Sequence, residues 1–115
     1  MGQDIKDHLA ENKVPFSETD TLDEVLPRAD VVYWTRLQRE RFADPALYEA
    51  VKGSFVLGSA ELAQMKPEAI LMHPLPRVGE IKPEVDHDPR SAYFRQAGNG
   101  MLVRMALLEW VCRPS

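Results

Sequence analysis

Two short segments carry residue types that can bind a substrate. The first, from Thr35 to Phe42, holds three guanidinium groups and an amide: Arg36, Gln38, Arg39 and Arg41. Alternate residues of an extended segment share one side, so Arg36 and Gln38 can face one ligand. A guanidinium group offers two parallel donors that match a carboxylate. The spacing therefore favours a dicarboxylate ligand. The alternative is a solvated charged loop in which Glu40 pairs with an arginine.

The second segment is the proline loop, His73-Pro74-Leu75-Pro76-Arg77. Proline fixes φ and has no backbone N–H, so the carbonyl groups from Pro74 to Pro76 face outward with little freedom. A substrate that carries an amide can donate to such carbonyls. A plain turn at the end of a strand is the alternative for this loop, and a histidine at a strand end is more often packed than bound to a ligand.

The loop that follows contains charged residues that we expect to form pairs and caps: Glu80, Asp86, Asp88 and Arg90. His87 between two aspartates is a weak metal pattern, and we expect no metal site there. The sequence has no phosphate-binding P-loop, dinucleotide glycine fingerprint, CxxC motif or nucleophile elbow. Cys112 is the one cysteine, which excludes an internal disulfide and fits a reducing compartment.

Each of these segments follows a short apolar run that predicts a strand. Val31-Val32-Tyr33-Trp34 precedes the first, and Ala69-Ile70-Leu71-Met72 precedes the second. Continuous β-branched and aromatic residues are typical of a strand covered on both faces. In open α/β sheets, ligands bind beyond the carboxyl ends of the strands. Both segments should therefore lie at the binding edge of one sheet.

Helices are expected around these strands. Apolar spacing and capping residues predict short helices over 4–12, from Thr19 or Thr21 to Pro27, over 45–51, and from Ser59 to Met65. Residues 92–112 predict one long helix, in which Gly98 and Gly100 suggest close approach of another backbone. Its continuous apolar stripe comprises Tyr93, Ala97, Met101, Met105, Leu108 and Val111 or Cys112.

Alternating short helices and buried strands predict an α/β fold with three layers and a mostly parallel sheet. A chain of 115 residues is long enough for one domain. It has few convincing strands, and the stripe on its C-terminal helix exceeds what so small a sheet can cover. We therefore expect residues 1–115 to form a single partial domain that needs the rest of a larger protein or an obligate partner.

The overall composition is that of a soluble globular protein, with 44% hydrophobic and 28% charged residues. A net charge of −4 gives little support for binding to nucleic acid. No apolar run approaches the roughly 20 residues of a transmembrane helix. We expect a soluble intracellular protein without a nucleic-acid or membrane partner.

Three motifs in register resemble the C-terminal half of aspartate transcarbamoylases. They are residues 35–41 (TRLQRER), 73–81 (HPLPRVGEI) and 88–100 (DPRSAYFRQAGNG). The resemblance extends from Ile5 to Val111 and implies a Rossmann-like aspartate-binding domain. Ornithine enzymes of the same group carry a cysteine in place of Pro74, so the sequence favours the aspartate branch.

The resemblance also implies roles for individual residues. Arg36 matches an arginine that binds the aspartate carboxylates, and Gln38 matches an amide that orients aspartate. Leu75 matches a residue whose backbone carbonyl holds the carbamoyl amide, at a Leu75-Pro76 bond that is cis in the family. Pro74 and Pro76 match residues of the same pocket wall. Arg41 matches part of a mobile segment that closes over the substrates. The residues expected to support this geometry are His73, Arg77, Glu80 and Arg104.

The reaction implied by the family transfers the carbamoyl group of carbamoyl phosphate to L-aspartate in pyrimidine biosynthesis, without a metal or organic cofactor. The family's phosphate loop, polarising histidine and second aspartate-binding arginine lie in an N-terminal half that this chain lacks. The resemblance thus implies no catalytic residue in this chain and no turnover by the chain alone. It further implies that helix 92–112 packs on a carbamoyl-phosphate domain and that the parent enzyme is a homotrimer, in the cytoplasm or an organelle such as the plastid.

Two other functions stay open at the level of sequence. One is a non-catalytic module that uses the fold for small-molecule binding or oligomer contacts. The other is a transcarbamoylase that acts on another amino acid.

Overall fold

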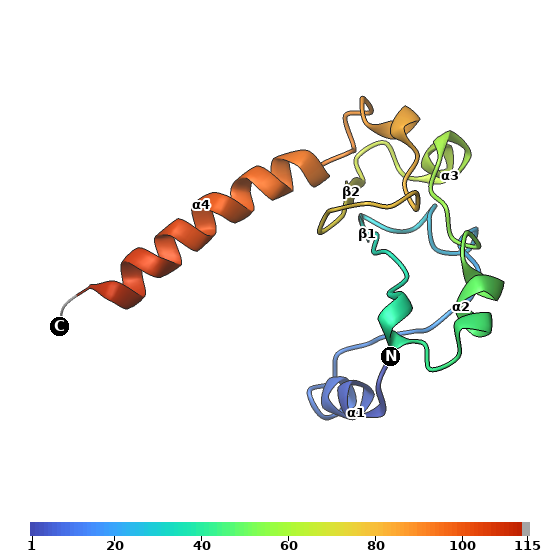
Figure 1. The fold of residues 1–115 in the computed structure, drawn as a ribbon, viewed down its shortest axis with the longest axis horizontal. Coiled ribbons are helices and arrows are strands. Elements are labelled where there is room, and N and C mark those ends of the chain that lie inside the picture. Colours follow the sequence, from blue (N-terminus) through green and yellow to red (C-terminus); the bar gives the residue numbers. More distant parts are fainter. Residues whose placement is uncertain (114–115) are drawn as a thin grey trace.

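The computed structural model describes residues 1–113. Two strands, β1 (Val31–Tyr33) and β2 (Ile70–Met72), pair in parallel. The helices, seen in Figure 1, are α1 (Gln3–Glu11), η1 (Arg39–Arg41), α2 (Pro45–Val51), α3 (Ser59–Gln64), η2 (Pro83–Val85) and α4 (Tyr93–Cys112). The predicted α/β class, with a parallel sheet and a long C-terminal helix, is confirmed.

Extended segments continue the hydrogen bonding beyond the strand pair. On the free edge of β2, the N–H of Leu71 donates to the carbonyl of Arg90, and the N–H of Ala92 donates to the carbonyl of Leu71, both at 2.8 Å. Leu57 and Ile81 form a separate parallel bridge. The chain between β2 and α4 is thereby tied to the sheet at its end, which fixes where α4 begins.

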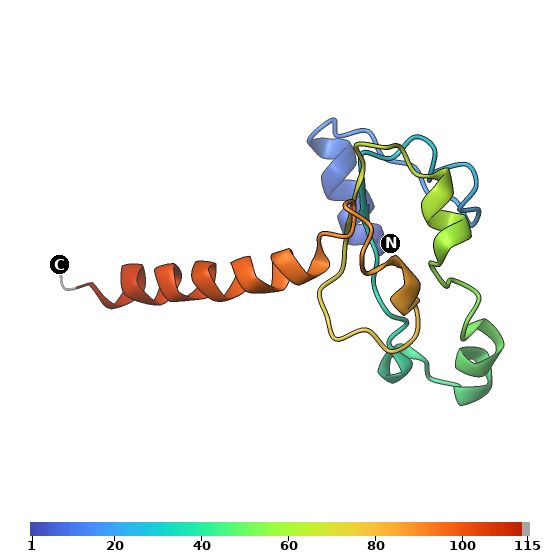
Figure 2. The ribbon, with the colours of Figure 1, turned by 90° about the horizontal axis from the view of Figure 1, so that it is seen from above.

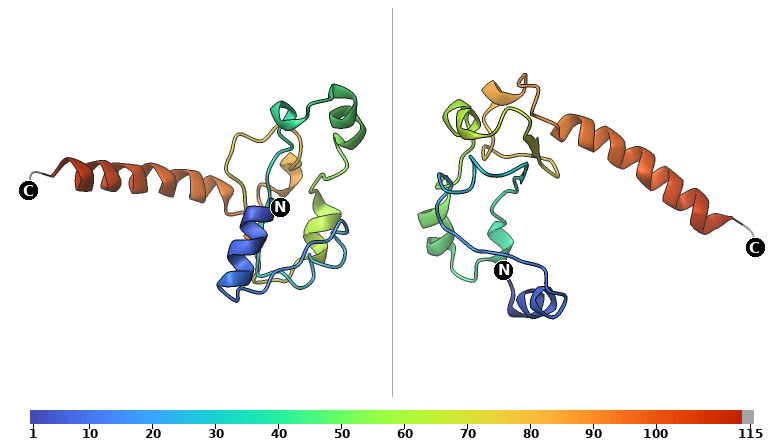
Figure 3. Two further views of the ribbon diagram at one scale, coloured as in Figure 1. Left: turned by 90° about the horizontal axis from the view of Figure 1, so that it is seen from below. Right: turned by 180° about the vertical axis from the view of Figure 1, so that it is seen from behind.

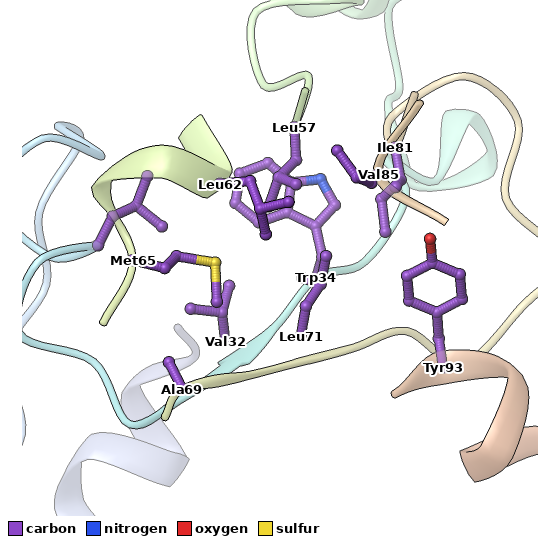
Figure 4. Packing of buried hydrophobic residues seen from close by; sticks show 11 residues of the cluster. Val32, Trp34, Leu57, Leu62, Met65, Ala69, Leu71, Ile81, Val85 and Tyr93 are labelled. Atoms are coloured by element: carbon purple, nitrogen blue, oxygen red, sulfur yellow. The ribbon is translucent and has the colours of Figure 1, made fainter. Parts of the chain in front are cut away.

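The core lies on one side of the strand pair. Val32 and Leu71 contribute side chains from the strands, and Trp34 contributes one from the residue after β1. Leu62 in α3 and Met65 just after it cover them (Figure 4). Tyr93 is fully buried and is the one described residue of α4 that belongs to this core. The remaining members of the cluster are Leu26, Leu57, Ala69, Ile81 and Val85.

The opposite face of β1 is open, so the prediction of a strand covered on both faces is wrong for residues 1–113. Val31 and Tyr33 are each 53% exposed, whereas Val32 between them is buried. Successive side chains of a strand point to opposite faces. Figure 2 shows α1 and α3 as two separate helices, and α1 buries none of its own residues, so it does not close the open face.

Two local predictions differ from the structure. Residues 22–28 form consecutive turns rather than a helix, because Pro27 has no N–H to donate and the segment spans little more than one turn. At α3 the N-cap is Gly58 rather than Ser59. The N–H of Gly58 donates to the Glu61 carboxylate at 2.8 Å, while the Ser59 hydroxyl donates to Glu84 at 2.9 Å.

Helix α4 extends away from the body of the molecule (Figures 1 and 3). Its apolar residues are exposed, as expected from a stripe too large for the sheet: Met101, Leu102, Val103, Met105, Leu107, Leu108, Trp110 and Val111. The close backbone approach predicted at Gly98 is absent among the described residues, since a Cβ there would meet open space. Within residues 1–113, no helix combines the length and apolar character required to cross a membrane.

Candidate substrate-binding site

The two segments singled out in the sequence leave the sheet at adjacent points. Tyr33 at the end of β1 is paired with Met72 at the end of β2, and the N–H of Trp34 donates to the carbonyl of Met72 at 2.8 Å. Arg36 lies three residues after Tyr33, and Leu75 lies three residues after Met72. Parallel pairing therefore starts both loops from the same edge, where ligands bind in open α/β sheets.

The Arg36 loop lines a cavity of about 510 Å³ together with residues 78–80. Arg36 and Glu80 therefore face one space, with Tyr48, Lys52 and Phe55 on the α2 side. Sequence reasoning overlooked Lys52, because nothing in its neighbourhood distinguishes it from a surface lysine. Gln38 caps η1 and Arg41 ends it, and neither lines this cavity.

Arg36 forms an ion pair with Glu40, at 3.0 Å between Nη2 and Oε1. The pairing proposed as the alternative at the level of sequence is thus present. Both side chains are largely exposed, at 43% and 61%. Exposed pairs of this kind contribute about 0–1 kcal/mol, so a substrate carboxylate can replace Glu40 at little cost.

The proline loop is held in shape by a buried histidine and a glutamate. The N–H of Leu75 donates to Nδ1 of His73 at 2.9 Å, so the ring carries its proton on Nε2 and donates to Glu80 at 2.7 Å. The other oxygen of Glu80 accepts from the N–H of Val78 at 2.8 Å. His73 is 1% exposed. These bonds join the start and the end of the loop.

The backbone between these bonds has an unusual conformation. The Leu75-Pro76 peptide bond is cis, as the resemblance implied, and Leu75 has a φ of 49°. Positive φ brings the Cβ of an ordinary residue close to the following carbonyl and costs roughly 1–2 kcal/mol. The bonds made by His73 and Glu80 hold the loop in this conformation.

The Glu80 carboxylate is ionised in this network. Burial raises the pKa of Glu80, but hydrogen bonds from the N–H groups of Val78 and Glu80 and from His73 outweigh it, so the pKa lies below its ordinary value of 4.5. An ionised Glu80 accepts from both the ring and the backbone. It also places a negative charge on the wall of the cavity that contains Arg36.

Arg77 is bound by residues from the following loop and from α4. Its guanidinium forms a two-point ion pair with Asp86, with Nη2 to Oδ2 at 2.6 Å, and its Nη1 donates to the hydroxyl of Tyr93 at 3.3 Å. The Tyr93 hydroxyl also donates to Asp86. Arg77 lies 5.8 Å from the ring centre of Phe94. The proline loop is therefore anchored to the start of α4.

Asp88 and Arg90 form a second pair that serves another element. Arg90 binds Asp88 through Nε and Nη2, both at 2.9 Å, and its Nη1 donates to the carbonyls of Leu62 and Met65 at the end of α3. The aspartates flanking His87 are thus both bound to arginines. Residues 1–113 contain no group of three His, Cys, Asp or Glu side chains arranged to hold a metal ion.

A smaller cavity of about 270 Å³ lies between the proline loop and α4. Its lining includes Pro74 and Arg104, which forms no ion pair with any of residues 1–113. Gln96 also lines it and was not assigned a role from sequence, although it stands within the third motif. Tyr33 lines both this cavity and the larger one.

Comparison with known proteins decides the family. Residues 2–111 match the family model for the Asp/Orn binding domain of aspartate/ornithine carbamoyltransferases. The chain belongs to this carbamoyltransferase family. It is 52% identical over 110 residues to the chloroplastic aspartate carbamoyltransferase of Arabidopsis thaliana, and 51% identical over 111 residues to multifunctional protein CAD of Squalus acanthias. These matches cover 95% and 96% of the chain.

Solved structures of carbamoyltransferases share the fold. Aspartate transcarbamoylase of Trypanosoma cruzi in complex with carbamoyl phosphate and aspartate superposes with a TM-score of 0.82 and 41% identity, over 94% of this chain and 36% of that one. The chain spans 28% of the Arabidopsis enzyme and 5% of the Squalus protein. The resemblance to the aspartate-binding domain of aspartate transcarbamoylases is confirmed, over about a third or less of those proteins.

Proposed function

We propose that this chain is the aspartate-binding part of an aspartate transcarbamoylase, which transfers the carbamoyl group of carbamoyl phosphate to L-aspartate. The observation that carries the proposal is the common origin of the Arg36 loop and the proline loop at one sheet edge. The Trypanosoma relative has been crystallised with both of these substrates, and with N-(phosphonacetyl)-L-aspartic acid. The 41% sequence identity between this chain and the Trypanosoma enzyme supports assigning the same substrates to this chain.

In the proposed site, each loop binds one substrate. Arg36 and Gln38 bind and orient the carboxylates of L-aspartate, and Arg41 belongs to a segment that closes over it. The backbone carbonyl of Leu75, in a wall formed with Pro74 and Pro76, accepts from the amide of the carbamoyl group. His73, Glu80 and Arg77 keep the proline loop in place through the bonds described above, and Arg104 supports the geometry from α4.

The proposed reaction depends more on the relative positions of the two substrates than on acid or base groups. The amine of aspartate attacks the carbonyl carbon, the new C–N bond forms and the bond to the phosphate oxygen breaks; phosphate leaves and takes up the proton that the amine loses. Holding the two substrates in the correct orientation can supply roughly 7–11 kcal/mol of such a barrier. This chain contributes binding groups and no catalytic residue, so we propose that residues outside it bind the phosphate and polarise the carbonyl.

We also propose what surrounds the chain. Residues 1–115 form one partial domain, and helix 92–112 packs on a carbamoyl-phosphate domain, because its exposed apolar residues need cover. The parent enzyme is proposed to be a homotrimer in the cytoplasm. A plastid location is the alternative, since the relatives from Arabidopsis thaliana, Pisum sativum and Oryza sativa are named chloroplastic.

Reconstitution tests this function. The purified chain should form no carbamoyl aspartate, and co-expression with the remaining part of the Arabidopsis relative should restore the activity. In the restored enzyme, Arg36→Ala should raise the KM for aspartate roughly 10- to 100-fold, because hydrogen bonds between charged groups contribute about 1.5–3 kcal/mol. Arg28→Ala, at an exposed arginine outside both cavities, is the control.

Two results would contradict the proposal. Turnover by the pure chain would show that the site is complete without other residues. A reconstituted enzyme that carbamoylates another amino acid in preference to aspartate would assign the chain to a different transcarbamoylase. Binding of L-aspartate without any turnover in the complete protein would support the non-catalytic module.

A further inference from the structure

One side chain of α4 contacts the ends of both strands. The amide oxygen of Gln96 accepts from the backbone N–H of His73 at 3.0 Å, and its amide nitrogen donates to the hydroxyl of Tyr33 at 3.1 Å. Gln96 lies in the first turn of α4 and is half-buried. We propose that Gln96 is a positioning residue that fixes the proline loop relative to the end of β1, and so sets the spacing of the two substrate loops.

The chemistry of the three groups determines the orientation of the amide. A backbone N–H can only donate, so the Gln96 atom that faces His73 must be the oxygen. The NH₂ group then faces Tyr33, whose hydroxyl accepts. A side chain that makes both bonds at this length has to carry an acceptor and a donor at its tip, and glutamine does so without charge.

The position of Tyr33 explains why its bond to Gln96 matters for the site. Tyr33 lines the cavity that contains Arg36 and also the cavity that contains Pro74, and Gln96 lines the second. The bond between the two side chains therefore lies beside both the cavity of the Arg36 loop and the cavity that Pro74 lines. Tyr33 is 53% exposed and lies outside the core cluster formed by residues 1–113, so the bond from Gln96 to its hydroxyl restrains its ring.

The effect on the reaction follows from its geometry. The inference rests on the proposed function, in which an amine bound by the first loop attacks a carbonyl bound by the second. A misplacement of about 1 Å between reacting groups can reduce the rate about 100-fold. The free energy of substrate binding depends less on this spacing, since each substrate contacts mainly its own loop. Loss of the Gln96 contacts should therefore lower kcat more than it raises KM.

The test uses the complete enzyme with two variants and a matched control. Gln96→Met keeps the length of the side chain and removes both hydrogen bonds, whereas Tyr33→Phe removes one hydroxyl. Gln64→Met makes the same substitution at an exposed residue of α3. We expect Gln96→Met to lower kcat about 10- to 100-fold with KM for aspartate changed by less than about threefold, and Gln64→Met to behave like the wild type.

Coupling between the two positions separates positioning from general stability. If Gln96 acts through Tyr33, the double variant should lose little more kcat than Gln96→Met alone. Independent, multiplicative losses in the double variant would overturn the proposal, as would a kcat for Gln96→Met within about twofold of the wild type. Should Gln96→Met fail to fold, Tyr33→Phe carries the test, and an unchanged kcat in that variant overturns the proposal.

A second readout does not depend on activity. Hydrogen exchange of the peptide that contains His73 and Leu75 should be at least about tenfold faster in Gln96→Met than in Gln64→Met, because the His73 N–H loses its acceptor. Unchanged exchange overturns the positioning role. If the wild-type enzyme lacks carbamoyl transfer, the proposed function fails, and this measurement still decides whether Gln96 holds the loop.

Discussion

The aspartate at position 86 shows how a single residue can anchor the proline loop. Asp86 accepts from Arg77 and from the buried Tyr93. Its pKa lies below the ordinary value of 3.8, first because Arg77 donates to it and then because Tyr93 does, which together outweigh its burial. Burial and the bond to Asp86 raise the pKa of Tyr93, so its hydroxyl remains a donor.

Asp86 should make stability depend on acid pH. A carboxylate with a lowered pKa contributes stability that is fully present above its unfolded pKa, near 3.8, and is lost as the pH falls through the folded value. Asp86→Asn should therefore be less stable than the wild type at neutral pH and lose less stability on acidification. Urea unfolding from neutral pH to about pH 2.5 measures both effects.

The exposed Asp23, which has no hydrogen-bond partner among residues 1–113, provides the control. Asp23→Asn should follow the wild-type curve over the same range of pH. If Asp86→Asn and the wild type lost stability in parallel below pH 3.8, the pair with Arg77 would not be the origin of the acid sensitivity.

Residue types were predictable from the sequence, and most of their partners were not. A pairing of Glu40 with an arginine was foreseen as the alternative, and the structure shows that the partner is Arg36. The contact between Gln96 and Tyr33 joins residues 63 positions apart, and no local pattern points to it. Such a pair exists only because β1, β2 and the start of α4 meet at one place, which is a property of the fold.

At the scale of elements, continuous apolar runs predicted both strands, and spacing predicted α1, α2, α3 and α4 to within a few residues. The segment 22–28 was misjudged because a Thr cap and an apolar triplet resemble a helix start, although so short a helix needs tertiary packing. Leu26 does reach the core, but through turns. The open face of β1 was missed because an apolar strand gives no sign of what covers it.

Helix α3 provides a prediction about a single cap. Arg90 donates to the carbonyls of Leu62 and Met65 at the C-terminal end of α3, where the carbonyl of Leu62 also accepts from the N–H of Met65. Arg90→Met should lower the free energy of unfolding by about 1–3 kcal/mol. Arg90→Lys should restore little of it, because an ammonium group cannot bind Asp88 at two points and still reach both carbonyls.

Urea unfolding of both variants at neutral pH checks this prediction. Arg28→Ala, an exposed arginine without a partner among residues 1–113, should leave the midpoint unchanged. A lysine variant as stable as the wild type would mean that charge alone, without the planar group, is sufficient at this position.

At the scale of the whole molecule, α4 is the element that the described residues leave unexplained. Its exposed apolar side chains occur at 101, 102, 103, 105, 107, 108, 110 and 111, so they surround the helix rather than forming one stripe. A helix that is apolar on every side is normally buried. The arrangement supports the proposal that a further domain covers α4 from more than one direction.

The fluorescence of Trp110 can show whether a further domain packs against α4. Trp110 is 72% exposed, and the other tryptophan, Trp34, is buried with an indole N–H that has no partner among residues 1–113. Trp34→Phe removes that unpaired group and leaves Trp110 as the one fluorophore of its kind. In this background, the emission of Trp110 should shift to shorter wavelength when the carbamoyl-phosphate part is added, because the ring leaves water.

A charged substitution on α4 should weaken binding to the partner domain without changing the stability of the chain. Leu108 is 67% exposed in the chain, so Leu108→Asp should change the stability of the chain by less than about 0.5 kcal/mol. In the complex the carboxylate would be buried without a partner, and the affinity for the carbamoyl-phosphate part should fall at least about tenfold. Titration followed by Trp110 emission gives both affinities, with Gln64→Asp on α3 as the control. Equal affinities for the two variants would show that the apolar surface of α4 is not where the partner domain binds.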